Sequence, residues 1–210
     1  KGFYDAIAFW DAQHGLVLGD PVDGRFVIRT TDDGGTTWTS IAQETMPRAD
    51  EGEGAFAASG TCLIARKGSR QAWFVTGGGT SGRVFRSDDR GRSWTATTTP
   101  MHAGKATAGL FTVAFLDFRH GYAAGGDYKD VKRADLNGIR TSDGARWIRQ
   151  PLAPTGFFSA VIAVPGSAMD LIGVGPVGSA VSRDRGRTWT SWGDLPLNAV
   201  AFLDAKTGWA

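Results

Sequence analysis

A short phrase that ends in tryptophan occurs four times along the chain, at intervals of about 50 residues. It reads TDDGGTTW at 31–38, SDDRGRSW at 87–94 and SRDRGRTW at 182–189, with a shortened copy, TSDGARW, at 141–147. A catalytic motif is seldom needed four times in one chain, whereas a structural turn often is. Repeats of this period indicate a fold made of stacked copies of one small unit.

Each period contains segments typical of four short strands. In the first period they lie at 4–10, 15–20, 25–30 and 37–42, and turns rich in Gly or Asp separate them. No window shows the apolar spacing of a long helix. Four antiparallel strands per period are typical of a propeller blade. We therefore predict an all-β fold, a β-propeller of four-stranded antiparallel blades.

A second phrase keeps step with the first: AFWDAQHG at 8–15, AFLDFRHG at 114–121 and AFLDAKTG at 201–208. Together the two phrases predict one propeller domain over 1–210, an incomplete ring of about four blades plus the start of a fifth. Both ends look cut, so we expect a fragment of a longer protein. The expected blades span roughly 1–42, 54–98, 108–151 and 157–193, with a partial one at 197–210.

The repeated phrase is expected to form the turn between the third and fourth strands. Its Asp can accept hydrogen bonds from backbone N–H groups, its Gly can take a positive φ, and its Trp can bury a large ring between neighbouring sheets. A structural role is therefore predicted for the recurrent residues, which are Asp33, Trp38, Asp89, Trp94, Asp143, Trp147, Asp184 and Trp189.

The pattern Ser/Thr-x-Asp-x-Gly-x-x-Trp resembles the Asp-box, or bacterial neuraminidase repeat, of β-propellers. The phrase VAFLDxxxGxAxG, at 113–125, looks most similar to the photosystem II stability/assembly-factor-like proteins of bacteria. That resemblance implies a scaffold that helps to assemble or stabilise a membrane-associated complex outside the cytoplasm. Asp-box propellers also include glycoside hydrolases, and one fold supports many activities.

Composition excludes several other classes of protein. The net charge of +2 is too balanced for a nucleic-acid binder, and the apolar runs are too short for a membrane span. Cys62 is the single cysteine, so neither a disulfide framework nor a thiolate metal site is expected. No cofactor is expected: GGGTSG at 77–82 leads into a strand, where a dinucleotide site needs a helix. The acids of 127–137 lack the spacing of a calcium loop.

Residues that do not recur between blades are the candidates for function. The turns after the second strands and the crossovers between blades share one face of the disc, which we call the loop face. A glycoside hydrolase would use two carboxylates there, and the candidates are Asp20, Glu53 and Asp127. Further loop-face residues expected to contact a ligand are Asp23, Glu51, Tyr128, Lys129 and Arg133.

The opposite face carries the repeated turns, and we call it the turn face. Arginines occupy variable positions of three successive turns, so they are expected to form a basic arc that can pair with carboxylates of an acidic partner. The candidates are Arg90, Arg92, Arg183, Arg185 and Arg187. His14 and His120 occupy equivalent turn positions that Thr207 fills in the third copy, which indicates a turn preference.

The expected function is therefore non-enzymatic: a rigid disc that binds a protein partner, in an exported, periplasmic or secreted protein. A sialidase- or xyloglucanase-like glycoside hydrolase is the alternative, and carbohydrate is then the ligand.

Overall fold

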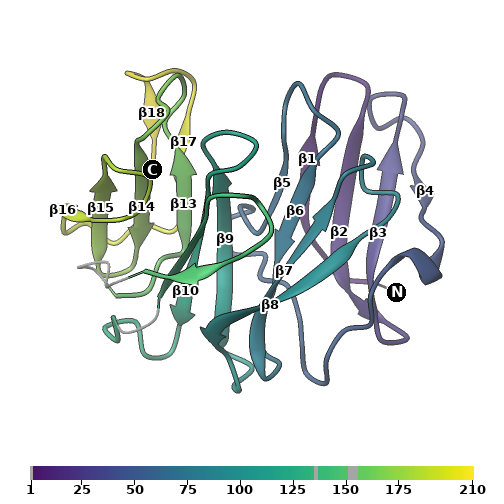
Figure 1. Ribbon diagram of the computed structural model, residues 1–210, viewed down its shortest axis with the longest axis horizontal. Coiled ribbons are helices and arrows are strands. Elements are labelled where there is room, and N and C mark those ends of the chain that lie inside the picture. The colour runs from purple at the N-terminus through teal and green to yellow at the C-terminus, as the bar shows by residue number, and fades with distance from the viewer. Residues whose placement is uncertain (1, 135–136, 151–155) are drawn as a thin grey trace.

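The computed structural model describes residues 2–134, 137–150 and 156–210, and within them nearly all regular structure is β (Figure 1). Four four-stranded antiparallel sheets are followed by a two-stranded one. The strands are β1 (Tyr4–Phe9), β2 (Gly15–Val22), β3 (Arg25–Thr31), β4 (Thr39–Ser40); β5 (Leu63–Ala65), β6 (Ala72–Val75), β7 (Ser81–Ser87), β8 (Thr95–His102); β9 (Ala108–Phe115), β10 (Gly121–Asp127), β11 (Gly138–Thr141), β12 (Ile148–Arg149); β13 (Ala160–Ala163), β14 (Leu171–Gly175), β15 (Gly178–Ser182), β16 (Thr190–Gly193); and β17 (Ala201–Phe202) with β18 (Gly208–Trp209). A single 3-10 turn, η1 (Gln43–Thr45), is the helical element of the described ranges.

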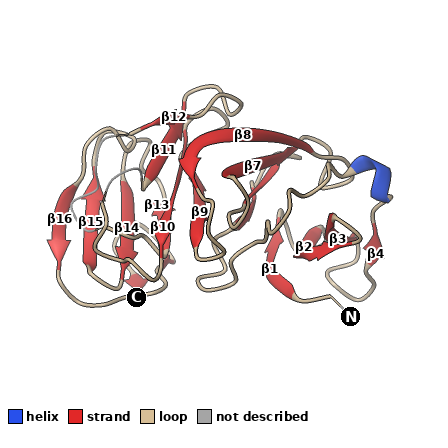
Figure 2. Cartoon of the chain, turned by 90° about the horizontal axis from the view of Figure 1, so that it is seen from below, coloured by secondary structure: helices blue, strands red, loops and turns tan. Residues whose placement is uncertain are grey.

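The sheets are arranged as a fan, with β1–β4 on the right and β13–β16 on the left in Figure 2. Their first strands contact one another in sequence, β1 with β5, β5 with β9 and β9 with β13. In three sheets the last strand, β4, β12 or β16, is exposed along its whole length. Each sheet keeps the simple order of the chain, and the ring is not closed. The predicted all-β propeller with an incomplete ring is confirmed. No helix in the described part of the chain has the length and apolarity to cross a bilayer.

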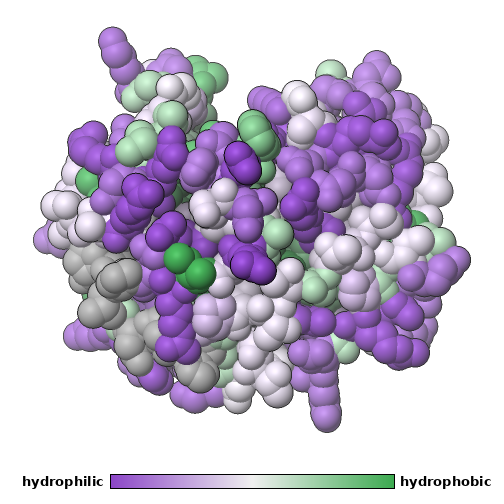
Figure 3. Space-filling view, viewed as in Figure 1, coloured by the Kyte–Doolittle hydropathy of each residue, from purple (hydrophilic) through white to green (hydrophobic). Residues whose placement is uncertain are grey.

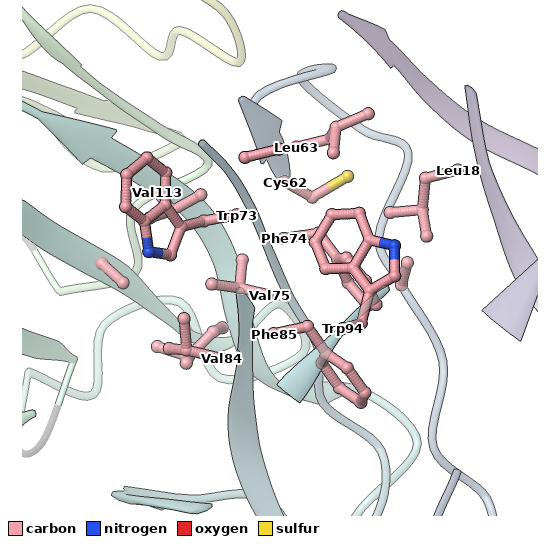
Figure 4. Packing of buried hydrophobic residues seen from close by; sticks show 14 of the residues in the cluster. Leu18, Cys62, Leu63, Trp73, Phe74, Val75, Val84, Phe85, Trp94 and Val113 are labelled. Carbon is pink, nitrogen blue, oxygen red and sulfur yellow. The ribbon is translucent and has the colours of Figure 1, made fainter. Parts of the chain in front are cut away.

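The core lies between successive sheets, and aromatic rings fill much of it (Figure 4). Phe26 of β3 packs on Phe74 and Phe85 of the next sheet, with ring centroids 5.2 and 5.3 Å apart. Trp73 of β6 stacks on Phe115 of β9 at 3.9 Å. Burying each such side chain contributes about 1.5–3 kcal/mol. Neighbouring blades therefore stabilise each other through interlocked aromatic side chains.

Hydrogen bonds also join three sheets close to their first strands. The hydroxyl of Thr61 donates to that of Thr112 at 2.8 Å, and Thr112 in turn donates to the carbonyl oxygen of Val161 at 3.2 Å. The backbone N–H of Val161 donates back to the Thr112 hydroxyl at 2.9 Å. Thr112 is fully buried, so this paired polar network fixes the relative positions of the second, third and fourth sheets.

The repeated turns share one hydrogen-bond pattern, which is complete at 87–94. The Ser87 hydroxyl donates to Asp89 at 2.8 Å and accepts from the Gly91 N–H at 2.8 Å. The Asp89 carboxylate accepts from the backbone N–H groups of Arg92 and Ser93 at 3.0 and 2.9 Å. The Trp94 indole donates to the Gly91 carbonyl at 2.9 Å. The recurrent Ser, Asp and Gly thus close the turn around the tryptophan.

Each of the later turns packs against the sheet that precedes it. A Cβ on Gly91 would lie 3.3 Å from Leu16 of the first sheet, and one on Gly186 would clash with the ring of Tyr122 in the third. Trp189 lies 5.1 Å from that same Tyr122 ring. Each of these turns therefore packs into the interface between two neighbouring blades.

Candidate functional site

Glu53, the first hydrolase candidate on the loop face, is buried and bound internally. Its Oε1 accepts from the Thr76 hydroxyl at 2.5 Å and from Arg83 Nε at 2.9 Å, and its Oε2 accepts from Arg83 Nη2 and from the Asp50 N–H at 2.8 Å. Arg83 Nη2 also donates to the Arg48 carbonyl at 2.9 Å. Since the Glu53 side chain has no exposed surface, the carboxylate fastens the crossover to β6 and β7.

Asp20 contacts the residues that directly follow Glu53, but it does not share the hydrogen bonds of Glu53. Its Oδ1 accepts from the Ala55 N–H at 3.1 Å, two residues beyond Glu53. Asp20 also affects Asp5 of β1, whose two carboxylate oxygens are buried with no hydrogen-bond partner. Burial, together with the smaller effect of the negative charge of Asp20, raises the pKa of Asp5 to about 7. A raised pKa is one requirement of a general acid.

Asp127, the third hydrolase candidate, belongs to another sheet and is held by cations and donors. Its Oδ1 accepts from the Lys129 N–H at 2.9 Å, and its Oδ2 lies 3.2 Å from Lys105 Nζ. Although burial raises the pKa of Asp127, hydrogen bonds from Lys129, Thr107 and Lys105 lower it below the usual value. The carboxylate stays ionised, which suits a structural anchor of the loop better than a proton donor.

The remaining acids predicted on the loop face are exposed. Asp23 forms the β2–β3 turn with Gly24, and both have a positive φ, 53° and 75°. Such a turn matches the twist of a two-residue hairpin. Glu51 lies beside Gly52, in the crossover that Glu53 fastens, and is exposed. Within the described residues, neither Asp23 nor Glu51 contacts Asp127.

A pocket of about 430 Å³ lies on the loop face where three sheets and the last crossover meet. Tyr128 and Val131 of the β10–β11 loop form one side, and Tyr128 is 46% exposed. Lys129 and Arg133, also predicted as binding residues, are exposed on the same loop. The structure thus places Tyr128, Lys129 and Arg133 on one loop beside a cavity, while Asp20 and Glu53 lie at the boundary between the first and second sheets.

On the turn face, several of the predicted binding arginines contact the preceding blade. Arg90 Nη2 lies 3.9 Å from Asp11, and Arg92 Nη2 lies 3.3 Å from Asp32, both in turns of the first sheet. Arg185 Nη1 lies 3.1 Å from His120 Nε2 of the third sheet. These side chains are therefore partly occupied in joining blades.

The other two predicted arginines have a looser setting. Arg183 lies 4.0 Å from Asp170 in its own sheet, and Arg187 is exposed.

The described face seen in Figure 3 is largely hydrophilic, with apolar residues scattered over it.

The two histidines complete Asp-centred turns. Nδ1 of His14 lies 2.8 Å from Asp11, and Nδ1 of His120 lies 2.7 Å from Asp117. In the third copy, the backbone N–H of Thr207 donates to Asp204 at 2.8 Å. Because threonine fills the position as well, the histidines fit a role in the turn.

Within the described residues, no group of three or more His, Cys, Asp or Glu side chains is placed to hold a metal ion. Cys62 is buried, and burial, together with the smaller effects of Asp5 and Asp20, raises the pKa of its thiol to about 12. The thiol stays protonated at neutral pH and is a poor nucleophile or ligand.

Sequence reasoning missed Asp5, Arg83 and the aromatic lining of the pocket. Asp5 had a visible signal, a lone acid in the apolar segment YDAIAFW. Arg83 gave no such signal, because it lies 30 residues from its partner Glu53 and in an ordinary strand.

Comparisons with known proteins support the fold. No protein-family model and no curated protein matches the chain. The crystal structure of the Niastella koreensis GH74 enzyme matches 97% of this chain and 32% of its own, with a TM-score of 0.71 and 16% identity. A structure of YCF48 bound to D1 peptide matches 90% of this chain and 54% of its own, with a TM-score of 0.57 and 17% identity. At such identities the likeness shows a propeller scaffold, and the chain spans about a third and about half of these two proteins.

Proposed function

We propose that the chain is part of a non-enzymatic Asp-box propeller that binds a protein partner through its loop face. The observation that carries the proposal is that the Glu53 carboxylate is buried and accepts hydrogen bonds from Arg83, Thr76 and the Asp50 N–H. A glycosidase needs two carboxyl groups that reach one scissile bond. Glu53 is enclosed and Asp127 is tied to Lys105, so these two acids serve the scaffold.

The loop face has the features of a binding surface. It offers an exposed tyrosine and lysines on a loop that hydrogen bonds fix in place, and binding residues are commonly carried by such loops. The likeness to YCF48, which was solved with a D1 peptide, supports a peptide or protein ligand. We further propose an exported protein that helps to assemble or stabilise a membrane-associated complex.

The alternative is a glycoside hydrolase, and Asp5 is the observation that favours it. Its raised pKa is what a general acid requires, and Asp20 is the charge that acts on it. The likeness to the GH74 enzyme is compatible with this candidate. Asp5 is only 7% exposed, however, so a substrate reaches it only if the surrounding chain opens.

Photo-crosslinking in the native host tests the protein-binding proposal. A photoreactive residue at position 129 probes the loop face, and one at position 67, in the β5–β6 turn, probes the turn face. We expect a discrete crosslinked partner from position 129 and none from position 67. A partner captured from position 67 alone would move binding to the turn face.

Hydrolysis assays test the alternative. Purified protein is incubated with xyloglucan and with sialosides, beside Asp5→Asn and Asp20→Asn variants. We expect no product from any of them. Product formation that both substitutions abolish would replace the scaffold proposal with the hydrolase.

A further inference from the structure

The geometry points to the loop-face pocket as a receptor for one aromatic or branched apolar side chain, carried by an extended acidic segment of the partner protein. This inference rests on the proposed protein-binding function and specifies the chemistry of the ligand. Four features carry it: the walls of the pocket, its rigidity, its few polar groups and the charge of its rim.

The walls of the pocket are aromatic. Phe56 and Phe111 stack with centroids 3.7 Å apart and planes 9° apart, and Phe157 meets Phe111 edge-on at 4.8 Å. Phe111 and Phe157 are almost wholly buried, at 3% and 4% exposed, whereas Tyr128 lies at the rim. Ala57 and Ala58 add no bulk where the pocket opens to solvent. An open cavity of about 430 Å³ with such walls favours an apolar group.

The pocket is formed before any ligand arrives. The N–H of Tyr128 donates to the Thr107 carbonyl at 3.2 Å, and the N–H of Phe157 donates to the Val131 carbonyl at 2.9 Å. These bonds tie the β10–β11 loop to the start of β9 on one side and to the residues before β13 on the other. A rigid receptor loses little conformational entropy when it binds, so a short segment can bind it usefully.

The polar groups of the pocket are too few for a sugar. Ser159 and Asn198 are the polar side chains of the lining apart from the Tyr128 hydroxyl, and Ser159 Oγ is already 3.5 Å from Asn198 Oδ1. No carboxylate of the described residues lines the cavity. A sugar ring presents several hydroxyls, and each would lose its water without a partner here. An apolar side chain meets no such cost.

The loop beside the pocket supplies positive charge. Lys129 and Lys132 are exposed, and neither forms an ion pair with any other described residue. Asp127 is paired with Lys105, which leaves Asp130 as the exposed acid among the described residues of this loop. Carboxylates on either side of the inserted side chain would therefore gain from the local field, with a larger effect on association rate than on affinity.

Tyr128 is the residue on which affinity should depend most. It is 46% exposed, its ring meets Phe111 edge-on at 6.1 Å, and it lies between the apolar pocket and Lys129. A tyrosine at such a boundary buries a large ring and keeps its hydroxyl for a hydrogen bond to a peptide backbone.

A display experiment tests the inference. A random library of linear dodecapeptides is selected on the protein, and the peptides recovered are measured by titration against four forms: the native sequence, Tyr128→Ala, Ala58→Trp and Tyr4→Ala. Tyr4 is the matched control, because it is also 46% exposed and lies on β1. A glycan array serves as a parallel probe.

We expect recovered peptides to carry an aromatic or branched apolar residue beside Asp or Glu. Tyr128→Ala and Ala58→Trp should weaken their binding by at least about tenfold, while Tyr4→Ala leaves it unchanged. The inference is overturned if no such peptide is enriched, if the peptides bind Ala58→Trp as well as the native protein, or if a glycan binds in a Tyr128-dependent way. A crosslinked partner from position 129 that Ala58→Trp still binds would overturn this inference and leave the proposed function standing.

Discussion

The guanidinium of Arg83 donates from Nε and Nη2 to the two carboxylate oxygens of Glu53. This fork-shaped pair is buried, and it joins the crossover after the first sheet to the third strand of the second. Breaking one side of such a pair leaves a buried charge without a partner, which costs more than the pair contributes.

Glu53→Gln is therefore expected to lower the free energy of unfolding by about 3–5 kcal/mol. Urea denaturation followed by tryptophan fluorescence measures it. Glu51→Gln is the matched control: Glu51 is exposed two residues away, and its replacement should change stability by no more than about 0.5 kcal/mol. Equal effects of the two substitutions would show that the ion pair contributes little.

The raised pKa of Asp5 makes the free energy of unfolding depend on pH. Its pKa is raised to about 7 in the folded chain, against 3.8 for a solvent-exposed aspartate, so the folded state binds the proton more tightly than the unfolded state. Stability from this group is then fully present below pH 4 and is lost as the pH rises through about 7, with a total effect on the order of a few kcal/mol.

Asp5→Asn should remove this pH dependence and make the chain more stable than the native sequence at pH 8. Thermal unfolding between pH 4 and pH 8 measures both effects. Asp33→Asn is the control of opposite sign, because hydrogen bonds from Thr37 and Thr31 lower the pKa of Asp33 to about 2. If the stability of Asp5→Asn varied with pH in parallel with that of the native chain, the raised pKa of Asp5 would be refuted.

Gly186 tests the contact between a turn and the sheet before it. Gly186→Ala combines a positive φ of 77° with a clash against the Tyr122 ring, whereas Gly104→Ala has a φ of 75° and nothing within 4 Å of the new Cβ. Gly104→Ala should cost about 1 kcal/mol from backbone strain alone. Gly186→Ala should cost clearly more, as measured by urea denaturation. Equal losses would mean that the turn does not depend on close packing.

The four turn tryptophans should contribute unequally to stability. Trp94 is 5% exposed: its ring packs against Phe74, and its backbone N–H donates to the Thr45 carbonyl of the preceding crossover at 2.9 Å. Trp94→Ala is expected to cost about 3–5 kcal/mol. Trp38 belongs to the first of the described sheets, and its ring is only half-buried. Trp38→Ala should cost markedly less in the same assay, and a similar cost would show that burial against a preceding sheet is unimportant.

The fold was predictable because its information is local and repeated. Segments such as GLVLGD and RFVIRT alternate with Gly- and Asp-rich turns, and four similar copies reinforce one another. Strand order followed directly, because each sheet pairs strands that are neighbours in the chain. The hydrogen bonds of Ser87 and Asp89 in the turn likewise depend on residues within four positions.

The site was less predictable because its contacts are long-range. Absence of a residue from the other blades predicts a functional role, yet Glu53 does not recur and forms an internal ion pair with Arg83. Its partner Arg83 was visible only once two strands and a crossover were placed in space. The pocket is also formed by long-range contacts, since Phe56, Phe111 and Phe157 lie in or just before the first strands of three different sheets.

The backward-facing contacts of the repeated turns give assembly of the disc a direction. Gly91 and Gly186 each pack against a sheet that is synthesised earlier, so we expect each of these two turns to find its partner sheet already present. The blades can then fold one after another from the N-terminus during synthesis, and each new blade covers the exposed face of the one before it.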